Sequence, residues 1–281
     1  EGVTRADQTG CLCKLAAILW AFGLCYRQVE AIMGAFGVRL GRSSVWRDVQ
    51  ALGEEMKRRR WWGRVRVLGV DGAWLRAKGE QTGVVVAVDL GTGEPVGLEV
   101  VDEHDFQAVL AWLAELVEAL GVEVIVTDDL MQYRQMAAEL GVDHHVCAFH
   151  MRRWVGRSLR SLTKKLGTEW RGILDEVRQI ITEMPADGDL QLFELWARIP
   201  AQPPKAGEKA SALYQLRQIL VRLSEYWSGY RLYMEKGDVP STNNGTERAI
   251  GKLKIRSRSV RGYKSDAGIQ AAFQLCSGTF S

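Results

Sequence analysis

The first sixty residues carry the apolar spacing of short amphipathic helices. Apolar side chains recur at offsets 0, 3, 4 and 7 from Leu15, and again from Val29, which places each set on one face of a helix. A third apolar stripe starts at Val45, just after Ser43, a residue type that favours the N-cap position. Three short helices with a glycine-containing turn before the third predict a helix-turn-helix domain over residues 1–60.

In a helix-turn-helix, the exposed face of the third helix enters the DNA major groove. The residues on that face are Ser44, Arg47, Asp48 and Gln50. We expect Arg47 and Gln50 to contact DNA. The same apolar pattern also fits a small helical bundle for docking or dimerisation, and this segment alone does not separate the two interpretations.

After residue 60 the hydrophobic pattern changes to that of β-strands. We expect strands at 64–70, 83–90, 95–101, 122–126 and 144–146, and helices at 106–120 and 131–140. The first strand runs apolar into Asp71-Gly72, a common way for a chain to leave a strand. Three strands in a meander, followed by helix, strand, helix and strand, form the element order of the ribonuclease-H-like fold.

The pattern from Phe149 to about Lys236 is helical, which predicts a mainly helical insertion at about 151–238. A last long helix is expected to start near Asn244. The predicted architecture is therefore an α/β fold. A ribonuclease-H-like mixed sheet with its helical insertion occupies residues 61–281, preceded by the helix-turn-helix domain.

Composition places the chain among ordinary globular proteins. Its 281 residues are 47% hydrophobic and 25% charged, which excludes a collagen-like or wholly disordered chain. No apolar run approaches the ~18–20 residues of a membrane span, so we expect no membrane partner. Five cysteines form an odd set, which we interpret as reduced thiols of a cytoplasmic protein.

The net charge of +3 conceals an uneven distribution. Residues 71–130 contain 13 acidic side chains against two basic ones, whereas residues 151–171 and 248–264 are strongly basic, with aromatic residues interleaved. Such blocks would contact phosphates, although a single block is usually a solvated helix face. The DNA contacts expected in these blocks are Arg152, Arg153, Arg157, Arg248, Lys252, Lys254, Arg256 and Arg258.

Three carboxylates stand out by their position. Asp71 follows the first strand, Asp128 ends the fourth, and Glu247 lies in the first turn of the last long helix. If the two strands are neighbours, Asp71 and Asp128 emerge side by side, and a helix over that edge can add Glu247. Hard oxygen ligands of this kind select Mg²⁺ or Mn²⁺. Two such ions ~3.5–4 Å apart can activate a water or a 3′-hydroxyl and stabilise the leaving oxygen at a phosphodiester.

Each carboxylate also has a purely structural interpretation. Asp128 or Asp129 can cap the helix that follows, and Asn244 and Glu247 are spaced as the N-cap and N3 residues of a capping box. Taken together, a carboxylate at each expected element of one fold favours the catalytic interpretation.

The residues around these carboxylates form recognisable strings. They are Val70-Asp71-Gly72, Val126-Thr127-Asp128, Cys147-Ala148-Phe149-His150 and Asn243-Asn244-Gly245-Thr246-Glu247-Arg248. In these strings the chain resembles bacterial insertion-sequence DDE transposases, and its Cys-x-x-His resembles the Mutator-like groups. The resemblance implies that Asp71, Asp128 and Glu247 are catalytic and hold two Mg²⁺ (or Mn²⁺) ions per active site. Asp129 directly follows Asp128, which leaves the second carboxylate ambiguous.

The resemblance also implies a function. The chain would be a DNA transposase that uses metal ions to cleave transposon ends and to transfer strands into target DNA. Its expected partners are double-stranded DNA and a second copy of the chain, forming a homodimer on DNA, in the bacterial cytoplasm in association with the nucleoid. Two alternatives remain: a catalytically inactive or domesticated transposase-derived DNA-binding regulator, and a ribonuclease-H-like nuclease that hydrolyses without joining.

Cys147 and His150 need two further ligands to form a zinc site, and the other cysteines supply no convincing second pair. The resemblance implies instead that Cys147, His150 and Asn244 support the active site or the DNA. The alternative is a buried cysteine on a short strand and a helix-capping histidine.

Overall fold

The computed structural model describes residues 10–59 and 63–277, so residues 60–62, at the predicted domain joint, lie outside the described part. The N-terminal helices are α1 (Gly10–Ala21), α2 (Tyr26–Ala35) and α3 (Arg42–Arg59). The strands are β1 (Val67–Ala77), β2 (Glu80–Asp89), β3 (Pro95–Glu99), β4 (Val124–Thr127) and β5 (Asp143–Val146). The remaining helices are α4 (Phe106–Leu120), α5 (Met131–Leu140), α6 (Ala148–Thr163), α7 (Arg171–Glu183), α8 (Gly188–Ala197), α9 (Ala212–Glu225), α10 (Trp227–Glu235), α11 (Asn244–Ser259) and α12 (Asp266–Ser277), with a 3₁₀ turn, η2 (Thr168–Trp170), before α7.

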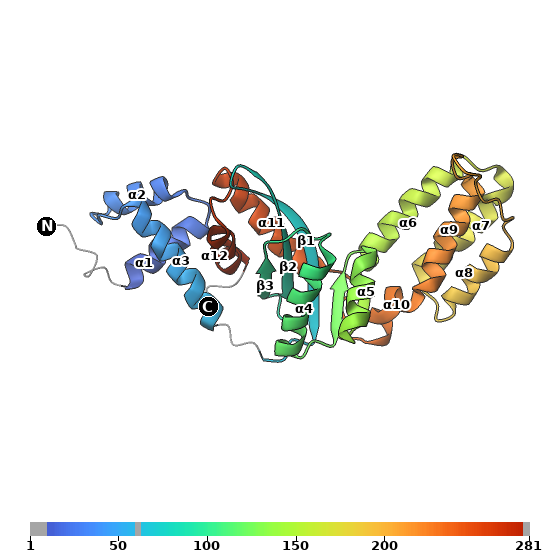
Figure 1. Cartoon of the computed structure of the whole chain (residues 1–281), viewed down its shortest axis with the longest axis horizontal. Helices are drawn as coiled ribbons and strands as arrows, with labels where there is room; N and C mark the ends of the chain where they lie inside the picture. The colour runs from blue at the N-terminus through green and yellow to red at the C-terminus, as the bar shows by residue number, and fades with distance from the viewer. Residues whose placement is uncertain (1–9, 60–62, 278–281) are drawn as a thin grey trace. The chain divides into compact units, whose positions relative to one another are not determined.

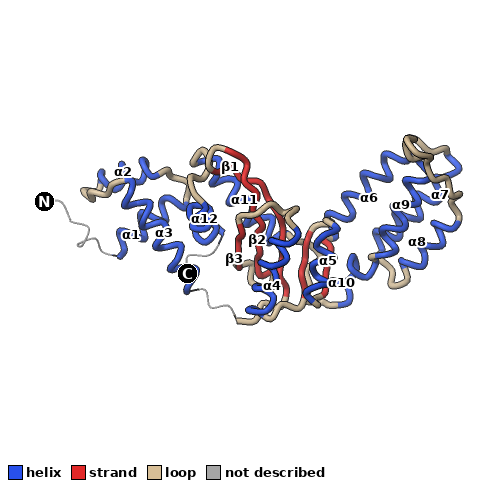
Figure 2. Tube along the Cα trace, in the orientation of Figure 1, coloured by secondary structure: helices blue, strands red, loops and turns tan. Residues whose placement is uncertain are grey.

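The described strands form one mixed sheet in the order β3-β2-β1-β4-β5. β1 pairs antiparallel with β2, and β2 pairs antiparallel with β3 (Figure 2). β1 and β4 are neighbours, which confirms the condition set for the first two carboxylates. The expectation that Asp71 ends the first strand is wrong: β1 continues to Ala77, and Asp71 lies opposite Val86 within the β1–β2 pairing.

The long β1–β2 hairpin turns at Lys78 and Gly79, which both have positive φ, +52° and +94°. Tight hairpins favour positive φ at both central residues, because that backbone twist matches the twist of the strands. Lysine is a poor signal for such a turn, and for this reason the pattern predicted a shorter first strand.

The chain divides into two compact units. Unit 1 comprises the described residues of Glu1–Ile125, Arg134–Val142 and Asn243–Ser281, and unit 2 comprises Val126–Tyr133 and Asp143–Thr242. Each unit is built around its own cluster of buried apolar side chains.

In unit 1, helices α1, α2 and α3 share a core with α11, α12 and one face of the β1–β2–β3 meander (Figure 1). Trp20, Val49 and Phe273 are buried members of this core. α3 crosses α12 closely, since a Cβ on Gly53 would lie 3.1 Å from the Cα of Ala271. The glycine therefore permits the close helix contact that buries the apolar stripe of α3.

In unit 2, helices α6 to α10 enclose the second core. Met151, Val155, Leu159 and Leu162 lie on the buried face of α6 at spacings of 4, 4 and 3 residues. This spacing follows the helical repeat and leaves the opposite face of α6 in solvent. The predicted helical character of the segment after Phe149 is thus confirmed.

The predicted helix boundaries at 106–120 and 131–140 match α4 and α5. Two terminal assignments are wrong. α3 begins at Arg42, so Ser43 lies inside the helix and is not its N-cap. The N-cap of α11 is Asn243, so Asn244 and Glu247 do not form the capping box that the structural interpretation offered for them.

Over the described residues, every helix is too short or too polar to traverse a lipid bilayer.

Candidate functional site

The loop after β4 presents Asp128. Its Oδ1 accepts a hydrogen bond from the backbone N–H of Leu130 at 3.1 Å, whereas its Oδ2 receives none from the described residues. Burial raises the pKa of Asp128, and the negative charge of Asp129 acts in the same direction. The Leu130 amide and His150 partly offset this rise. Asp128 is thus a half-buried carboxylate with one oxygen open, and its charge is stabilised when a cation binds.

The neighbouring Asp129 is already occupied by protein groups. Its Oδ2 lies 2.6 Å from Nη2 of Arg222, and its Oδ1 accepts a hydrogen bond from the hydroxyl of Tyr230 at 3.1 Å. Nη2 of Arg222 also donates to the backbone carbonyl of Asp129 at 3.0 Å. The side chain of Asp129 is only 9% exposed. The two adjacent aspartates therefore differ: Asp129 is held by the protein, and Asp128 is available to a ligand.

A cleft of about 390 Å³ opens beside Asp128 within unit 2. Its lining residues are Asp128, Asp129, Leu130, His150, Arg153, Trp154, Arg157 and Arg222. The guanidinium of Arg222 lies 4.4 Å from the ring centroid of Trp154, in a cation–π arrangement. A cleft with a carboxylate and several cationic side chains suits an anionic ligand bound together with a metal ion.

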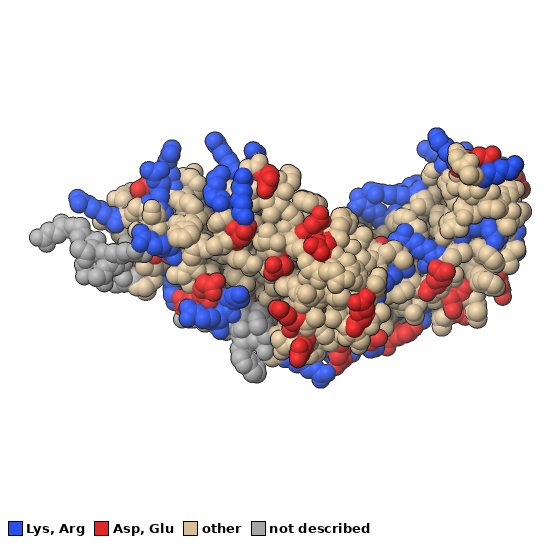
Figure 3. All heavy atoms as spheres, viewed as in Figure 1, with Lys and Arg blue, Asp and Glu red and all other residues tan. Residues whose placement is uncertain are grey.

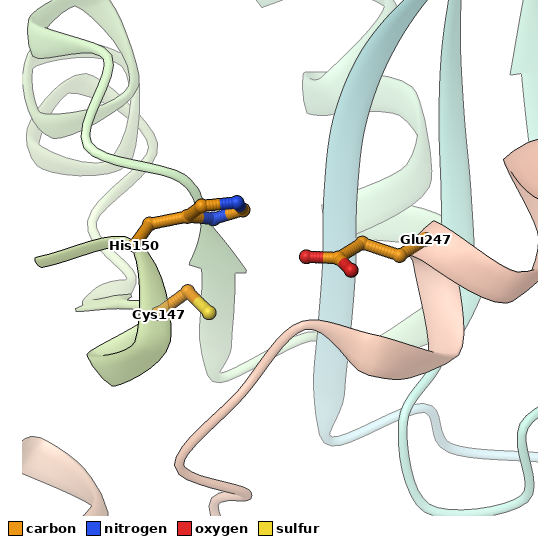
Figure 4. Close-up of side chains that lie close together, drawn as sticks. All are labelled: Cys147, His150 and Glu247. Atoms are coloured by element: carbon orange, nitrogen blue, oxygen red, sulfur yellow. The ribbon is translucent and has the colours of Figure 1, made fainter. Parts of the chain in front are cut away.

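Cys147 and His150 belong to the start of α6 (Figure 4). Cys147 is the N-cap residue and is fully buried; its backbone N–H donates to the carbonyl of Thr127 at 2.8 Å. The N–H of Ala148 donates to Ser241 at 2.9 Å. These bonds satisfy donors at the helix start and position the first turn that carries His150 into the cleft.

The solvent face of α6 is basic. Arg153, Arg157, Arg160 and Lys164 are exposed at successive spacings of 4, 3 and 4 residues, which aligns them in one stripe. We call these four residues the α6 stripe. It begins at the cleft and extends for about 16 Å along the helix. Figure 3 shows Lys and Arg side chains gathered over α6. Arg152, another predicted contact, is also exposed but lies off the stripe.

In unit 1, Asp71 and Glu247 come from β1 and α11. Asp71 lies two residues after Gly69, where an added Cβ would collide with the side chains of Asn243 and Thr246. The first turn of α11 therefore packs directly on this part of β1. Glu247 projects from that first turn (Figure 4).

Asn243 is a residue that sequence reasoning missed in favour of Asn244. Asn243 is buried, whereas Asn244 is exposed. The available signal was the buried face of α11, on which Thr246, Ala249, Ile250 and Leu253 follow the helical repeat. Asn243 stands three residues before Thr246 and so falls on that face, whereas Asn244 does not.

The predicted DNA contacts on α11 divide by exposure. Arg248, Lys252 and Arg258 are exposed, and Lys254 is half-buried. The expectation for Arg256 is wrong, because this side chain is 2% exposed. Its guanidinium lies 4.0 Å from the ring centroid of Trp20, and its Nη2 donates to the carbonyl of Leu24 at 2.9 Å. Burial lowers the pKa of Arg256.

On α3, Arg47 is exposed and its Nε donates to the carbonyl of Ser43 at 3.1 Å. The expectation that Asp48 is exposed is wrong: the residue is buried. Gln50 is half-buried and lines a cavity between α3 and α12, beside Gln274. The buried face of α3 is thus wider than its apolar stripe, because both α1 and α12 pack against this helix.

The fold and the cleft together define an α/β protein in which the carboxylate of Asp128 faces a cleft lined by arginine side chains. A family model described as "Transposase IS66 family" matches residues 111–271, more than half of the chain. The chain belongs to this family of transposases, which confirms the predicted resemblance to insertion-sequence transposases. No curated protein matches the chain.

Membership of this family indicates a transposase function, with DNA as the substrate and a nuclease-type activity. DDE transposases generally use divalent metal ions. The matched range includes Asp128, Cys147, His150 and Glu247, and it starts after Asp71 and the N-terminal helices.

Proposed function

We propose that this protein is a DDE transposase that cleaves phosphodiester bonds at transposon ends and transfers the strands into target DNA. Asp71, Asp128 and Glu247 are its catalytic, metal-binding residues, carried on a ribonuclease-H-like domain. The observation that supports this most directly is the contrast between Asp128 and Asp129. One carboxylate of the pair has an open oxygen in a basic cleft, and the other is held by Arg222 and Tyr230.

The residues fit a divalent metal. Asp71, Asp128 and Glu247 offer carboxylate oxygens, the hard ligands that Mg²⁺ and Mn²⁺ prefer. The open Oδ2 of Asp128 offers a ligand atom to a cation, and a bound cation would offset the burial that raises the pKa of this residue. Two bound ions would polarise the phosphodiester and promote ionisation of the attacking water or 3′-hydroxyl.

The chain's cationic side chains hold the DNA in this proposal. Arg153 and Arg157 line the cleft, and the rest of the α6 stripe continues away from it, so the stripe binds successive phosphates of one DNA backbone. The exposed Arg248, Lys252 and Arg258 of α11 add phosphate contacts on unit 1. α1, α2 and α3 serve as the helix-turn-helix domain, with Arg47 exposed on α3, and a homodimer brings two transposon ends together.

The test is strand cleavage and joining on the end sequences of the parent insertion element, with Mg²⁺ or Mn²⁺. We expect Asp71→Ala, Asp128→Ala and Glu247→Ala each to abolish both steps. Asp189→Ala is the matched control, because Asp189 is a partly exposed acid in the first turn of α8, in unit 2, and lies outside the cleft. Full activity in the Asp71→Ala or Glu247→Ala protein would contradict the proposal.

A second candidate function is DNA binding without catalysis, as in a regulator derived from a transposase. The observation in its favour is the solvent face of α3, which exposes Trp46 and Arg47 independently of any carboxylate. Salt-sensitive DNA binding, together with no Mn²⁺ uptake by titration calorimetry, would favour this candidate. Hydrolysis of the element ends without joining would instead indicate a nuclease.

A further inference from the structure

Helices α9 and α10 contact Asp129, in the loop that carries Asp128. Arg222 comes from the last turn of α9 and Tyr230 from α10, 93 and 101 residues further along the chain. Between them they engage both carboxylate oxygens and the backbone carbonyl of Asp129. The guanidinium carbon of Arg222 also lies 4.4 Å from the ring centroid of Trp154 of α6. Three helices therefore fix the residue directly after Asp128.

The chemistry of this network requires arginine. A single guanidinium nitrogen serves two acceptors on Asp129 while the planar group stacks on Trp154. A lysine ammonium is a compact point charge that cannot stack in this way, and it would leave acceptors of Asp129 less well satisfied. Because Asp129 is nearly buried, loss of its partner would leave an uncompensated charge, and the loop would shift to rehydrate it.

The loop has little freedom once Asp129 is held. Thr127, on the other side of Asp128, is fully buried, and its Oγ1 donates to the carbonyl of Asp128 at 2.7 Å and contacts Nε2 of His144 at 2.8 Å. Asp128 is thus anchored at the residues before and after it, so its carboxylate is directed into the cleft with few alternative orientations. Groups that orient a metal ligand in this way commonly change metal affinity by about 10- to 100-fold when they are removed.

We propose that Asp129, Arg222 and Tyr230 are positioning residues that orient Asp128 for metal binding, so that helices α9 and α10 influence the metal affinity of the active site. This inference rests on the proposed function of Asp128. It assigns Asp129 a role different from that of a metal ligand, and it gives helices α9 and α10 a role in metal binding.

The test measures Mn²⁺ binding to the full chain by electron paramagnetic resonance in the absence of DNA. We expect Arg222→Lys and Asp129→Asn to weaken Mn²⁺ binding by about 10- to 100-fold. Tyr230→Phe removes a single hydrogen bond and should weaken binding by about three- to tenfold. This mild variant keeps the proposal testable if the stronger ones fold poorly.

The matched control is Arg217→Lys. Arg217 lies on α9 as well, stacks 4.0 Å from the ring centroid of Trp196, and donates to the carbonyls of Trp196 and Ile199. It shares the helix and the kind of contacts of Arg222 but lies outside the cleft. We expect it to leave Mn²⁺ binding unchanged, even if it lowers the melting temperature as much as Arg222→Lys does.

The outcomes separate this inference from the proposed function. If Asp128→Ala abolishes Mn²⁺ binding but Arg222→Lys, Asp129→Asn and Tyr230→Phe bind as the wild type does, the positioning role is wrong and the proposed function stands. If Asp128→Ala itself binds Mn²⁺ normally, both are overturned. Weaker metal-free DNA binding in Arg222→Lys with unchanged Mn²⁺ affinity would make Arg222 a phosphate contact and would also overturn the positioning role.

Discussion

Asn243 and Val70 are joined by a buried hydrogen bond: the side-chain Nδ2 of Asn243 donates to the backbone carbonyl of Val70 at 2.9 Å. Oδ1 of Asn243 in turn accepts from Oγ1 of Thr246 at 2.7 Å. Val70 directly precedes Asp71, and Thr246 directly precedes Glu247. The Asn243 side chain therefore ties the first turn of α11 to the strand position next to a proposed catalytic residue.

Asn243→Ala should destabilise the protein, because it leaves the carbonyl of Val70 and the hydroxyl of Thr246 without their buried partner. We expect a loss of about 1–3 kcal/mol in the free energy of unfolding, measured by urea titration. Asn244→Ala is the matched control, since Asn244 is exposed, and should change stability by less than about 0.5 kcal/mol. Equal stability of the two variants would show that the buried bond contributes nothing.

Strand cleavage should also fall in Asn243→Ala protein assayed below its unfolding transition. The reason is that Glu247 lies on the turn that Asn243 holds. Cleavage at the wild-type rate in folded Asn243→Ala would show that α11 stays in place without this bond.

Arg256 and Lys252 lie one turn apart on α11, and alanine substitution should affect stability at Arg256 and DNA binding at Lys252. Arg256→Ala removes a buried cation from Trp20 and a donor from the carbonyl of Leu24, so we expect a loss of about 2–4 kcal/mol in stability. Lys252→Ala should leave stability nearly unchanged and weaken DNA binding, because Lys252 is exposed. Denaturant titration and fluorescence anisotropy with labelled DNA measure the two effects. A stable Arg256→Ala protein with weakened DNA binding would contradict this assignment.

Each residue of the α6 stripe should contribute one phosphate contact. Arg157→Ala and Arg160→Ala should each weaken DNA binding and reduce the slope of log Kd against log salt concentration by about 1. Arg198→Ala is the control in the same helical unit, because Arg198 is exposed and paired with Glu176. If all three variants show the wild-type salt dependence, DNA does not follow the α6 stripe.

His145 should make stability depend on pH. Its Nδ1 lies 2.9 Å from the carbonyl of Gly229, and burial lowers its pKa below the ordinary value of 6.5. The folded state thus binds a proton less readily than the unfolded state, so the contribution of His145 is complete above pH 6.5 and declines as the pH falls below it.

The measurement for this prediction is urea unfolding between pH 5 and pH 8. His145→Gln should lose part of the decline at low pH, because glutamine does not titrate and its amide can still donate to Gly229. His104→Gln, at an exposed position of unit 1, is the control and should follow the wild-type profile. A His145→Gln profile parallel to that of the wild type would exclude His145 as the source.

The sequence by itself was sufficient for the kind and order of most elements. The limits of α4 and α5 and the end of β4 before Asp128 follow from apolar periodicity, which reports locally which side of each element is buried. The resemblance to insertion-sequence transposases likewise came from short strings of adjacent residues, and the family match confirms it.

Only the tertiary structure decided which residue of two similar neighbours is held by buried hydrogen bonds or ion pairs within the protein. Asn243 differs from Asn244 because its partner, Val70, is 173 residues away, and Asp129 differs from Asp128 because Arg222 is 93 residues away. Arg256 is buried because α1 supplies Trp20 as its stacking partner. Local pattern identifies the side chains that can do chemistry, but their burial and hydrogen bonds depend on segments that only folding brings together.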